Sequence, residues 1–305
     1  MSQTHLLVYP FTGSGHIIPL LDLTDLLLRR GLTITVVISP VNLPLLDPLL
    51  SSHPSSLHKS HPSPPVAIVS DFFLGWTNEL ASHLGIRRVV FNPSGVLGSS
   101  IIQTMWRDAA EIYADDGDKD ENSLFSFPEI PKSPEFAMWQ LPPVSKYFKK
   151  GDPDYEAFRS GMLANMKSWG VVYNTFEELE KVYIDHMKKL MGHDRVWAVG
   201  PLLPDEEGPG RGGSSTVPSS DCLRDQYADE KLLVDELGVG KRVCEGRSDN
   251  VPDSVELARL LDESLSGDIA ERVKVKEMSQ AAKKAVKEGS SIRDLNTFME
   301  LLRRF

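Results

Sequence analysis

The sequence predicts an α/β fold in which a parallel sheet carries helices on both faces. Six short segments are rich in Val and Ile and are bounded by turn residues, which is the pattern of buried strands. Helical stretches lie between several of these segments, and strand–helix alternation with short links is typical of a doubly wound parallel sheet. After about residue 220 the pattern becomes almost entirely helical. A chain of 305 residues is long enough for two domains.

The first strand–helix unit lies at the start of the chain. HLLVYPF (5–11) has the composition of a strand, and PLLDLTDLLLRRG (19–31) has helical periodicity. Gly31, directly after two arginines, is placed to end this helix. The apolar stripe of the helix consists of Leu20, Leu23, Leu27 and Leu28. The same reasoning predicts strands over 33–39, 66–72, 87–93, 170–176 and 195–201, and a helix over 75–86.

Three segments interrupt the alternation. Residues 51–65 are rich in Ser, Pro and His, residues 115–122 form an acidic loop, and residues 204–220 have the composition of a linker. We therefore expect an N-terminal domain over 1–203, a linker over 204–220 and a second part over 221–305.

The second part is predicted to be mostly helical and to lack a complete sheet. Its one strand-like stretch is GKRVCEG (240–246). One short strand cannot form a second parallel sheet, because each parallel pairing needs its own crossover connection. Periodicity predicts helices over 225–238, 254–265, 270–289 and 292–305.

Composition argues against several classes of function. The net charge of −10 disfavours nucleic-acid binding, which needs clustered Lys and Arg. Cys222 and Cys244 form no CxxC motif, so we expect neither a disulfide framework nor structural zinc. No apolar run approaches the roughly 20 residues that span a bilayer, and a core strand stands where a signal peptide would be, so we expect a cytoplasmic protein. His53, His58 and His61 lie in a loop without Cys or carboxylate partners, and we expect no metal site there.

The glycine turn after the first strand does not have the pattern of a nucleotide-binding loop. Gly13-Ser14-Gly15 lacks the third glycine of the dinucleotide fingerprint. The second strand ends in ISPVN, without an acid to hold a ribose hydroxyl, and this disfavours a nicotinamide or S-adenosylmethionine enzyme. No Lys-Ser or Lys-Thr pair follows the turn, so it is not a P-loop.

His16, which follows this turn, has two interpretations from spacing alone. It is either a structural histidine or a catalytic base at the carboxyl end of a strand, where ligands bind in open α/β sheets. The positive end of the following helix dipole disfavours the imidazolium form. Asp71 ends the strand VAIVSD, and a neighbouring parallel strand would bring its carboxylate to the same edge of the sheet. A His16–Asp71 pair has the design of a general base for a hydroxyl group.

Several blocks of the sequence carry a family resemblance. PFTGSGHIIPLLDL, VSDFFLGWTNELASHLGI, GVVYNTFEELE, RVWAVGPLLP and DQYADEKLLVDELGVG together resemble plant UDP-dependent glycosyltransferases of secondary metabolism. GPLLP followed by RGGSS is similar to the branch that glycosylates flavonols, including at the 7-hydroxyl.

The resemblance implies a GT-B architecture of two Rossmann-like domains, with the acceptor on the N-terminal domain and the UDP-sugar on the C-terminal one. It implies that His16 deprotonates the hydroxyl of a small phenolic acceptor while Asp71 orients it. The UDP-sugar is then a co-substrate, the anomeric carbon is inverted, and no metal or cofactor is required.

The resemblance also implies roles in binding. Asp225 and Gln226 match the last two residues of the family's sugar-nucleotide signature, where they bind the sugar hydroxyls; from the sequence alone they would be read as capping a helix. Four residues near the pair in sequence are candidates to line an acceptor pocket, although such aromatic residues are more often part of a core. They are Phe11, Ser14, Phe72 and Trp76.

The chain departs from the family pattern on the donor side. The signature normally begins with a tryptophan that stacks on uracil and continues through a histidine, a GWNS-like stretch and a glutamate, but here SSDCLR leads directly into DQYADEKL. A strand and helices of the family are also replaced near 51–65, and the chain is about a third shorter than a full member. We therefore expect transfer to be slow or absent. The alternative is a truncated or splice product that keeps an acceptor pocket or pairs with a full-length relative.

Overall fold

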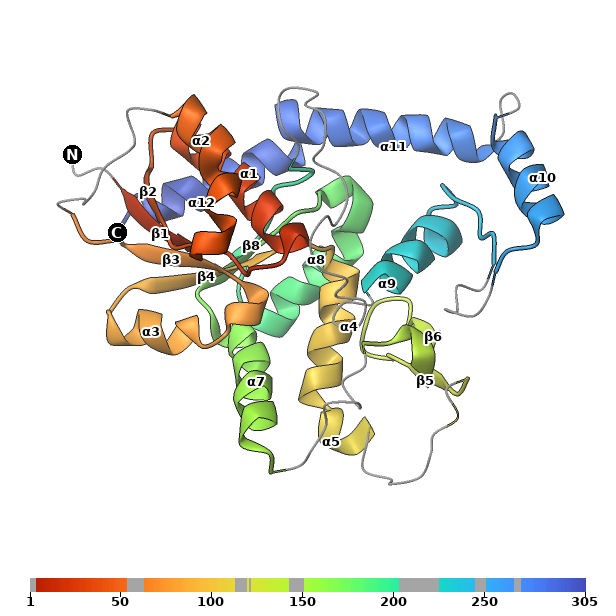
Figure 1. Cartoon of the computed structure of the whole chain (residues 1–305), viewed down its shortest axis with the longest axis horizontal. Coiled ribbons are helices and arrows are strands. Elements are labelled where there is room, and N and C mark those ends of the chain that lie inside the picture. The colour runs from red at the N-terminus through yellow and green to blue at the C-terminus, as the bar shows by residue number, and fades with distance from the viewer. Residues whose placement is uncertain are drawn as a thin grey trace.

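A single six-stranded parallel sheet forms the centre of the molecule (Figure 1). The computed structural model describes residues 4–53, 63–112, 120, 122–142, 151–202, 225–244, 251–265 and 270–305. The strands lie in the order β2-β1-β3-β4-β7-β8, so all six strands predicted from the sequence are present. Their bounds are β1 (His5–Tyr9), β2 (Thr33–Val36), β3 (Ala67–Asp71), β4 (Arg87–Asn92), β7 (Gly170–Tyr173) and β8 (Val196–Ala198).

The order of the strands reverses between β1 and β3. From β1 the chain passes outward to β2, whereas from β3 it passes in the other direction through β4, β7 and β8. Such a reversal opens a crevice outside the carboxyl ends of the two strands, and ligands of open α/β sheets bind there. The connecting elements are α1 (Ser14–Arg29), η1 (Pro40–Leu46), α2 (Asp47–Ser52), η3 (Phe72–Leu74), α3 (Thr77–His83), α4 (Val96–Arg107), α5 (Ala109–Ile112), α7 (Pro153–Ala164), η5 (Asn165–Lys167) and α8 (Glu177–Met191).

Helices cover both faces of the sheet. On one face, Leu6, Val8 and Val69 pack with α12 (Ser290–Leu302) and with three residues of the α1 leucine stripe. These three are Leu20, Leu23 and Leu27, and the fourth, Leu28, is not in this cluster. On the other face, Val90 and Val171 pack with α4, α7 and α8. Strands that are buried on both sides need apolar residues at successive positions, which explains their nearly continuous Val and Ile content.

The end of α1 follows the predicted form. Gly31 has a positive φ of 82°, a conformation that favours glycine. The N–H of Leu32 donates to the carbonyl of Leu27 at 3.2 Å, and the N–H of Gly31 donates to that of Leu28 at 2.9 Å. These bonds satisfy carbonyls of the last helical turn and direct the chain into β2.

A small antiparallel hairpin lies beside α4 and was not predicted. It consists of β5 (Leu124–Ser126) and β6 (Glu135–Ala137), followed by η4 (Met138–Gln140). Phe127 and Phe136 bury their rings in the same apolar cluster as α4.

The C-terminal part is helical, as predicted, and contains α9 (Asp225–Lys231), the π-helical turn η6 (Leu232–Glu236), α10 (Ser254–Leu265), α11 (Ala270–Lys287) and α12. The strand expected over 240–246 is wrong for the described residues 240–244, which form no strand. The charged side chains of this segment bind helices instead. Lys241 pairs with Glu263 at 3.1 Å, and Arg242 pairs with Asp235 at 2.6 Å. Among the described residues, no strand pairs with this segment.

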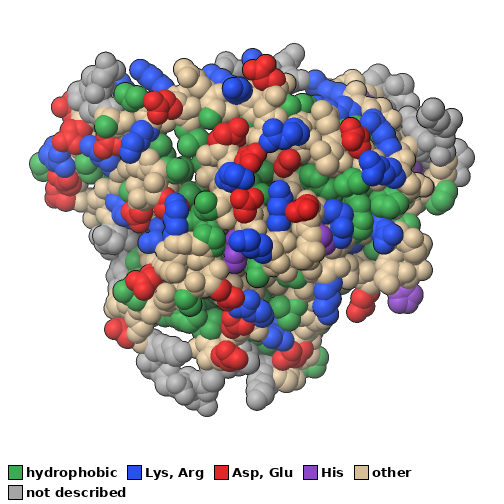
Figure 2. All heavy atoms as spheres, turned by 180° about the vertical axis from the view of Figure 1, so that it is seen from behind, with side chains coloured by type: hydrophobic (Ala, Val, Ile, Leu, Met, Phe, Trp, Pro, Cys, Tyr) green, Lys and Arg blue, Asp and Glu red, His purple; other side chains and the backbone are tan. Residues whose placement is uncertain are grey.

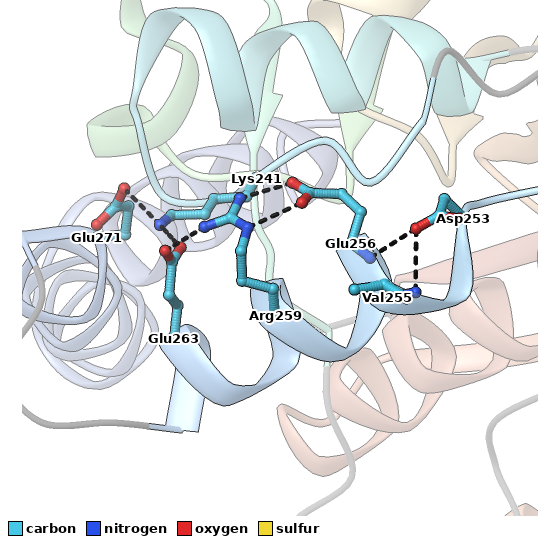
Figure 3. Close-up of polar contacts among 7 residues, drawn as sticks. All are labelled: Lys241, Asp253, Val255, Glu256, Arg259, Glu263 and Glu271. Carbon is cyan, nitrogen blue, oxygen red and sulfur yellow. Dashed lines mark hydrogen bonds and ion pairs between the residues drawn. The ribbon is translucent and has the colours of Figure 1, made fainter.

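The C-terminal helices differ in how they are held. The last helix, α12, is part of the main core, because Phe298 and Leu302 are fully buried on the sheet. In contrast, α10 lies at the margin of the molecule (Figure 1) and has no buried residue. Exposed ion pairs surround α10 (Figure 3): Arg259 with Glu256 and Glu263, and Lys241 with Glu263 and Glu271. Such pairs contribute little stability each.

The surface carries both signs of charge. On the face shown in Figure 2, acidic and basic side chains are interspersed with apolar ones. No helix among the described residues is long and apolar enough to cross a membrane. The linker expected over 204–220 lies outside the described residues, and the division into 1–203 and 221–305 stays a prediction.

Candidate active site

The structure brings His16 and Asp71 together across 55 positions of sequence. Gly13 precedes α1, and His16 is the third residue of the helix, just beyond the carboxyl end of β1. Asp71 is the last residue of β3, the strand next to β1 in the sheet. The Nδ1 atom of His16 lies 2.8 Å from Oδ2 of Asp71. The pair therefore occupies the crevice where the strand order reverses.

Hydrogen bonding fixes the orientation of both side chains. Asp71 is fully buried, and its second oxygen, Oδ1, accepts the N–H of Phe73 at 2.9 Å. An ionised carboxylate only accepts hydrogen bonds, so His16 donates from Nδ1, and Nε2 carries the lone pair. Nε2 of His16 makes no hydrogen bond with any residue in the described ranges. A histidine held in this way is equipped to take a proton from a bound hydroxyl group.

Aromatic rings surround the imidazole of His16. The ring centroids of Phe11, Phe72 and Phe73 lie 5.4, 5.6 and 5.1 Å from that of His16. Apolar rings lower the local polarity and so strengthen the hydrogen bond to Asp71. The sequence reasoning missed Phe73, although it lies only two residues after Asp71, in the short helix η3 that Asp71 caps.

The other candidate pocket residues have different environments. Phe72 is buried and also belongs to the core beneath α4. Ser14 is half-buried at the first position of α1. Trp76 is 50% exposed and packs its edge against Tyr9, with ring centroids 5.9 Å apart. Phe11 and Trp76 are the two of these rings with a surface available to a ligand.

The donor-sugar roles expected for Asp225 and Gln226 stay a prediction. Gln226 is exposed near the start of α9. For Asp225, the first residue of α9, only the backbone is among the described parts of the structure. This helix packs on α4, and its Ala228 is buried in the same apolar cluster as α4. No contact joins Gln226 to His16 or Asp71 among the residues that are described.

Three of the cavities are lined by described residues, and none of these three includes His16 or Asp71. A cavity between Phe72, Ser99 and Tyr173 measures about 20 Å³, which is enough for a water molecule and too small for an aromatic ligand. A larger open hollow contains Arg87 and Arg195 and lies at the amino ends of the strands, the edge opposite to His16. The site is therefore identified by the hydrogen bond between His16 and Asp71 and not by the volume of a cavity.

Histidines of the Ser- and Pro-rich segment form no metal cluster where they are described. His53 binds a carboxylate, with Nε2 2.7 Å from Oδ1 of Asp25, a partner that the sequence reasoning did not foresee. His58 and His61 lie outside the described residues. Within the described ranges, no group of three or more His, Cys, Asp or Glu side chains is arranged to hold a metal ion.

Comparison with known proteins gives several close relatives, although no family model matches the chain. UDP-glycosyltransferase 89B2 of Stevia rebaudiana is 39% identical over 84% of this chain and 64% of its own length. The chain thus spans less than two thirds of that relative. Flavonol 3-O-glucosyltransferase UGT89B1 of Arabidopsis thaliana is 32% identical in an alignment that covers 98% of this chain and 96% of the relative. That alignment runs over 463 positions, many more than the chain has residues.

Solved structures share the fold. The crystal structure of UGT89C1 from Arabidopsis thaliana complexed with UDP has a TM-score of 0.69 and 22% identity, with 99% of each chain covered. A UDP-glucosyltransferase from Polygonum tinctorium capable of glucosylating indoxyl has a TM-score of 0.75 and 18% identity, again with 99% of each chain covered. These likenesses confirm the expected GT-B-like fold class, with a parallel N-terminal sheet and a shortened, mostly helical C-terminal part.

Proposed function

Because this chain belongs to the plant UDP-glycosyltransferases, we propose that it acts on a hydroxyl group of a small phenolic acceptor such as a flavonol, with a UDP-sugar as co-substrate. The names of the relatives support the acceptor class: one is a flavonol 3-O-glucosyltransferase and another a flavonol 7-O-rhamnosyltransferase. UGT89C1, which shares the fold, has been crystallised with quercetin and with UDP-L-rhamnose.

The observation that carries this proposal is the 2.8 Å hydrogen bond between His16 and Asp71 at the strand-order reversal. Nε2 of His16 removes the proton from the acceptor hydroxyl, and Asp71 stabilises the imidazolium that forms. The acceptor oxygen attacks the anomeric carbon while the bond from that carbon to the UDP oxygen breaks. The configuration is inverted, and UDP leaves with the bonding electron pair.

The proposal also includes a low rate, because few residues of the chain match those that bind the UDP-sugar in the family. Of the sugar-nucleotide signature, only Asp225 and Gln226 match, and the described residues beyond 202 contain no strand. Positioning of two reactants is worth about 7–11 kcal/mol of the barrier, and stabilisation of the leaving group adds to this. Since each 1.36 kcal/mol is a factor of ten in rate, we propose that this chain transfers sugar slowly or not at all.

The second candidate is a non-catalytic product that retains an acceptor pocket or pairs with a full-length relative. The observation that favours it is α10, whose twelve residues include none that is buried. A transcript read across 50–65 and 220–225 tests this candidate. In-frame sequence missing at both junctions would support it, and an uninterrupted genomic reading frame there would count against it.

The experiment for the first candidate combines flavonol binding with product analysis. The purified chain is titrated with quercetin and then incubated with quercetin and UDP-glucose, with products detected by mass spectrometry. We expect saturable quercetin binding, trace product at most, and no product from His16→Ala. His83→Ala, which alters an exposed histidine on α3, is the matched control and retains whatever product the unmodified chain makes.

Two results would overturn parts of the proposal. Rapid turnover by the unmodified chain would contradict the incomplete donor site. Equal product from His16→Ala, with the fold intact by thermal melting, would contradict the role of His16 as the base.

A further inference from the structure

A buried arginine lies behind the His16–Asp71 pair. Arg88, the second residue of β4, is 2% exposed although it carries a full charge. Its guanidinium donates from Nε to Oγ of Ser70 at 3.0 Å and from Nη1 to Oδ1 of Asn165 at 2.9 Å. Within the described residues, no carboxylate makes a direct hydrogen bond with it. A guanidinium without a direct counterion is costly to bury, so a compensating charge is expected nearby.

That compensating charge is on the opposite face of the sheet. Arg88 pairs in register with Ile68, and its side chain runs along one face to Ser70 on the same face. Asp71, one residue further along β3, points its carboxylate to the other face, where α1 supplies His16. Nη2 of Arg88 donates to the backbone carbonyl of Asp71 at 3.4 Å. The guanidinium and the carboxylate are thus separated by little more than the backbone of β3.

The hydrogen bonds also fix the turn that carries the carboxylate. Arg88 binds the carbonyl of Asp71, and Nδ2 of Asn165 donates to the next carbonyl, that of Phe72, at 2.9 Å. The same turn places the N–H of Phe73 against Oδ1 of Asp71. Two consecutive carbonyls of this turn are therefore held from behind by one connected network, and the carboxylate itself binds the next residue.

Charge and burial agree with this geometry. Burial lowers the pKa of the Arg88 guanidinium to about 10, and the charge of Asp71 acts in the opposite direction. Asp71 faces His16 and the Phe73 N–H on its own side, and Arg88 faces it across the strand.

We propose that Arg88 is a positioning residue for the His16–Asp71 pair. From the far face of the sheet it holds the β3–η3 turn in place and supplies the positive charge that balances the buried carboxylate. This inference rests on the proposed role of His16 as a base, but its test needs neither a UDP-sugar nor turnover.

The test observes the hydrogen bond of the pair directly by proton NMR. A buried imidazole N–H bound to a carboxylate gives a resonance far downfield of the amide protons, and its absence in His16→Gln and Asp71→Asn assigns it. Three variants are compared with the unmodified chain. Arg88→Met removes the charge, Arg88→Lys keeps the charge without the forked geometry, and Arg87→Met removes an exposed charge from the neighbouring residue.

We expect the downfield resonance to be lost in Arg88→Met and retained in Arg88→Lys and Arg87→Met, with the amide spectrum otherwise preserved. Retention in a folded Arg88→Met would overturn the inference. Loss in both Arg88 variants would overturn the charge-balancing part of it and support the part in which the forked hydrogen bonds hold the β3–η3 turn. If Arg88→Met does not fold, Arg88→Gln is used, because it removes the charge and keeps an amide donor at this position. A weakened resonance then supports the inference, and an unchanged one overturns it. Absence of the resonance from the unmodified chain would instead count against the proposed function itself.

Discussion

Gly75, directly after η3, allows the chain to cross Gly161 of α7 closely, just after the residues that hold His16. A Cβ atom added to Gly75 would collide with the backbone carbonyl of Gly161. A Cβ atom added to Gly161 would lie 3.7 Å from Cα of Gly75, which is an ordinary contact. Gly75 has a φ of −56°, so its backbone alone would tolerate alanine. The absence of a side chain at Gly75 is therefore required by the contact and not by the turn.

The two substitutions should have opposite effects on stability. We expect Gly75→Ala to lower the free energy of unfolding by about 1–3 kcal/mol, because the backbones must separate. Gly161→Ala lies within a helix and should be neutral or raise the free energy of unfolding by up to about 1 kcal/mol. Urea denaturation measures both values. Similar losses in the two variants would show that the crossing is not packed as described.

At the scale of the elements, α12 and α10 show that helical sequence does not determine helical burial. Both have apolar residues at helical spacing, yet Leu302 of α12 is fully buried and Leu265 of α10 is 73% exposed. The difference comes from position. The helix α12 packs on the sheet together with α1, whereas α10 has no buried residue and forms exposed ion pairs with its neighbours in the described part of the chain.

The same substitution in each helix tests this difference. Leu302→Ala should lower the free energy of unfolding by about 2–5 kcal/mol, since it leaves a cavity in the core. Leu265→Ala should change it by no more than about 0.5 kcal/mol. Thermal and urea unfolding of the two variants provide the comparison. A large loss from Leu265→Ala would mean that α10 is packed against a partner in solution.

The docking of α12 also predicts a pH effect. Burial raises the pKa of the Asp294 carboxyl, against the opposing effects of the Ala198 N–H and of Lys188 and Arg293. The N–H of Ala198 donates to Oδ2 of Asp294 at 2.9 Å. A raised pKa means that the folded chain holds the proton more tightly than the unfolded chain, so ionisation costs stability. This cost is absent well below the ordinary pKa of about 3.9 and complete once the pH exceeds the raised value.

Asp294→Asn keeps an acceptor for the Ala198 N–H and removes the charge. We expect it to raise the free energy of unfolding at pH 7 relative to the unmodified chain, and we expect this gain to vanish below about pH 4. Urea denaturation at a series of pH values measures the difference. Asp262→Asn, at an exposed position of α10, is the control and should show no such gain. If the gain in the free energy of unfolding for Asp294→Asn does not depend on pH, burial of the Asp294 charge is not its cause.

At the scale of the whole molecule, the sequence predicts local pattern well and long-range contacts less well. The six strands and the helices α1 and α9 to α12 follow from periodicity, which depends on neighbouring residues. His16 and Asp71 could be paired because both follow parallel strands, whose carboxyl ends share one edge. The hydrogen-bond network of Arg88 could not be predicted in this way. It depends on the strand order and on Asn165, which lies 77 positions away in the sequence.

The one wrong element, the strand over 240–246, has a clear physical cause. The strand expected over 240–246 had suitable residues, but a strand needs a partner edge, and none is present beside its described part. The local composition of that segment was suitable, and the missing partner decided the outcome. The donor roles of Asp225 and Gln226 stay a prediction, because these two residues match a signature whose remaining residues are absent.

The central claim is that this chain keeps the base of a glycosyltransferase and lacks a complete site for the sugar nucleotide. Calorimetric titration of the folded, monodisperse chain with UDP and with UDP-glucose tests it most directly. We predict no saturable heat of binding up to low-millimolar concentrations of either ligand, while quercetin still binds. Saturable binding of UDP at micromolar concentrations would contradict the claim and would mean that a donor site is present.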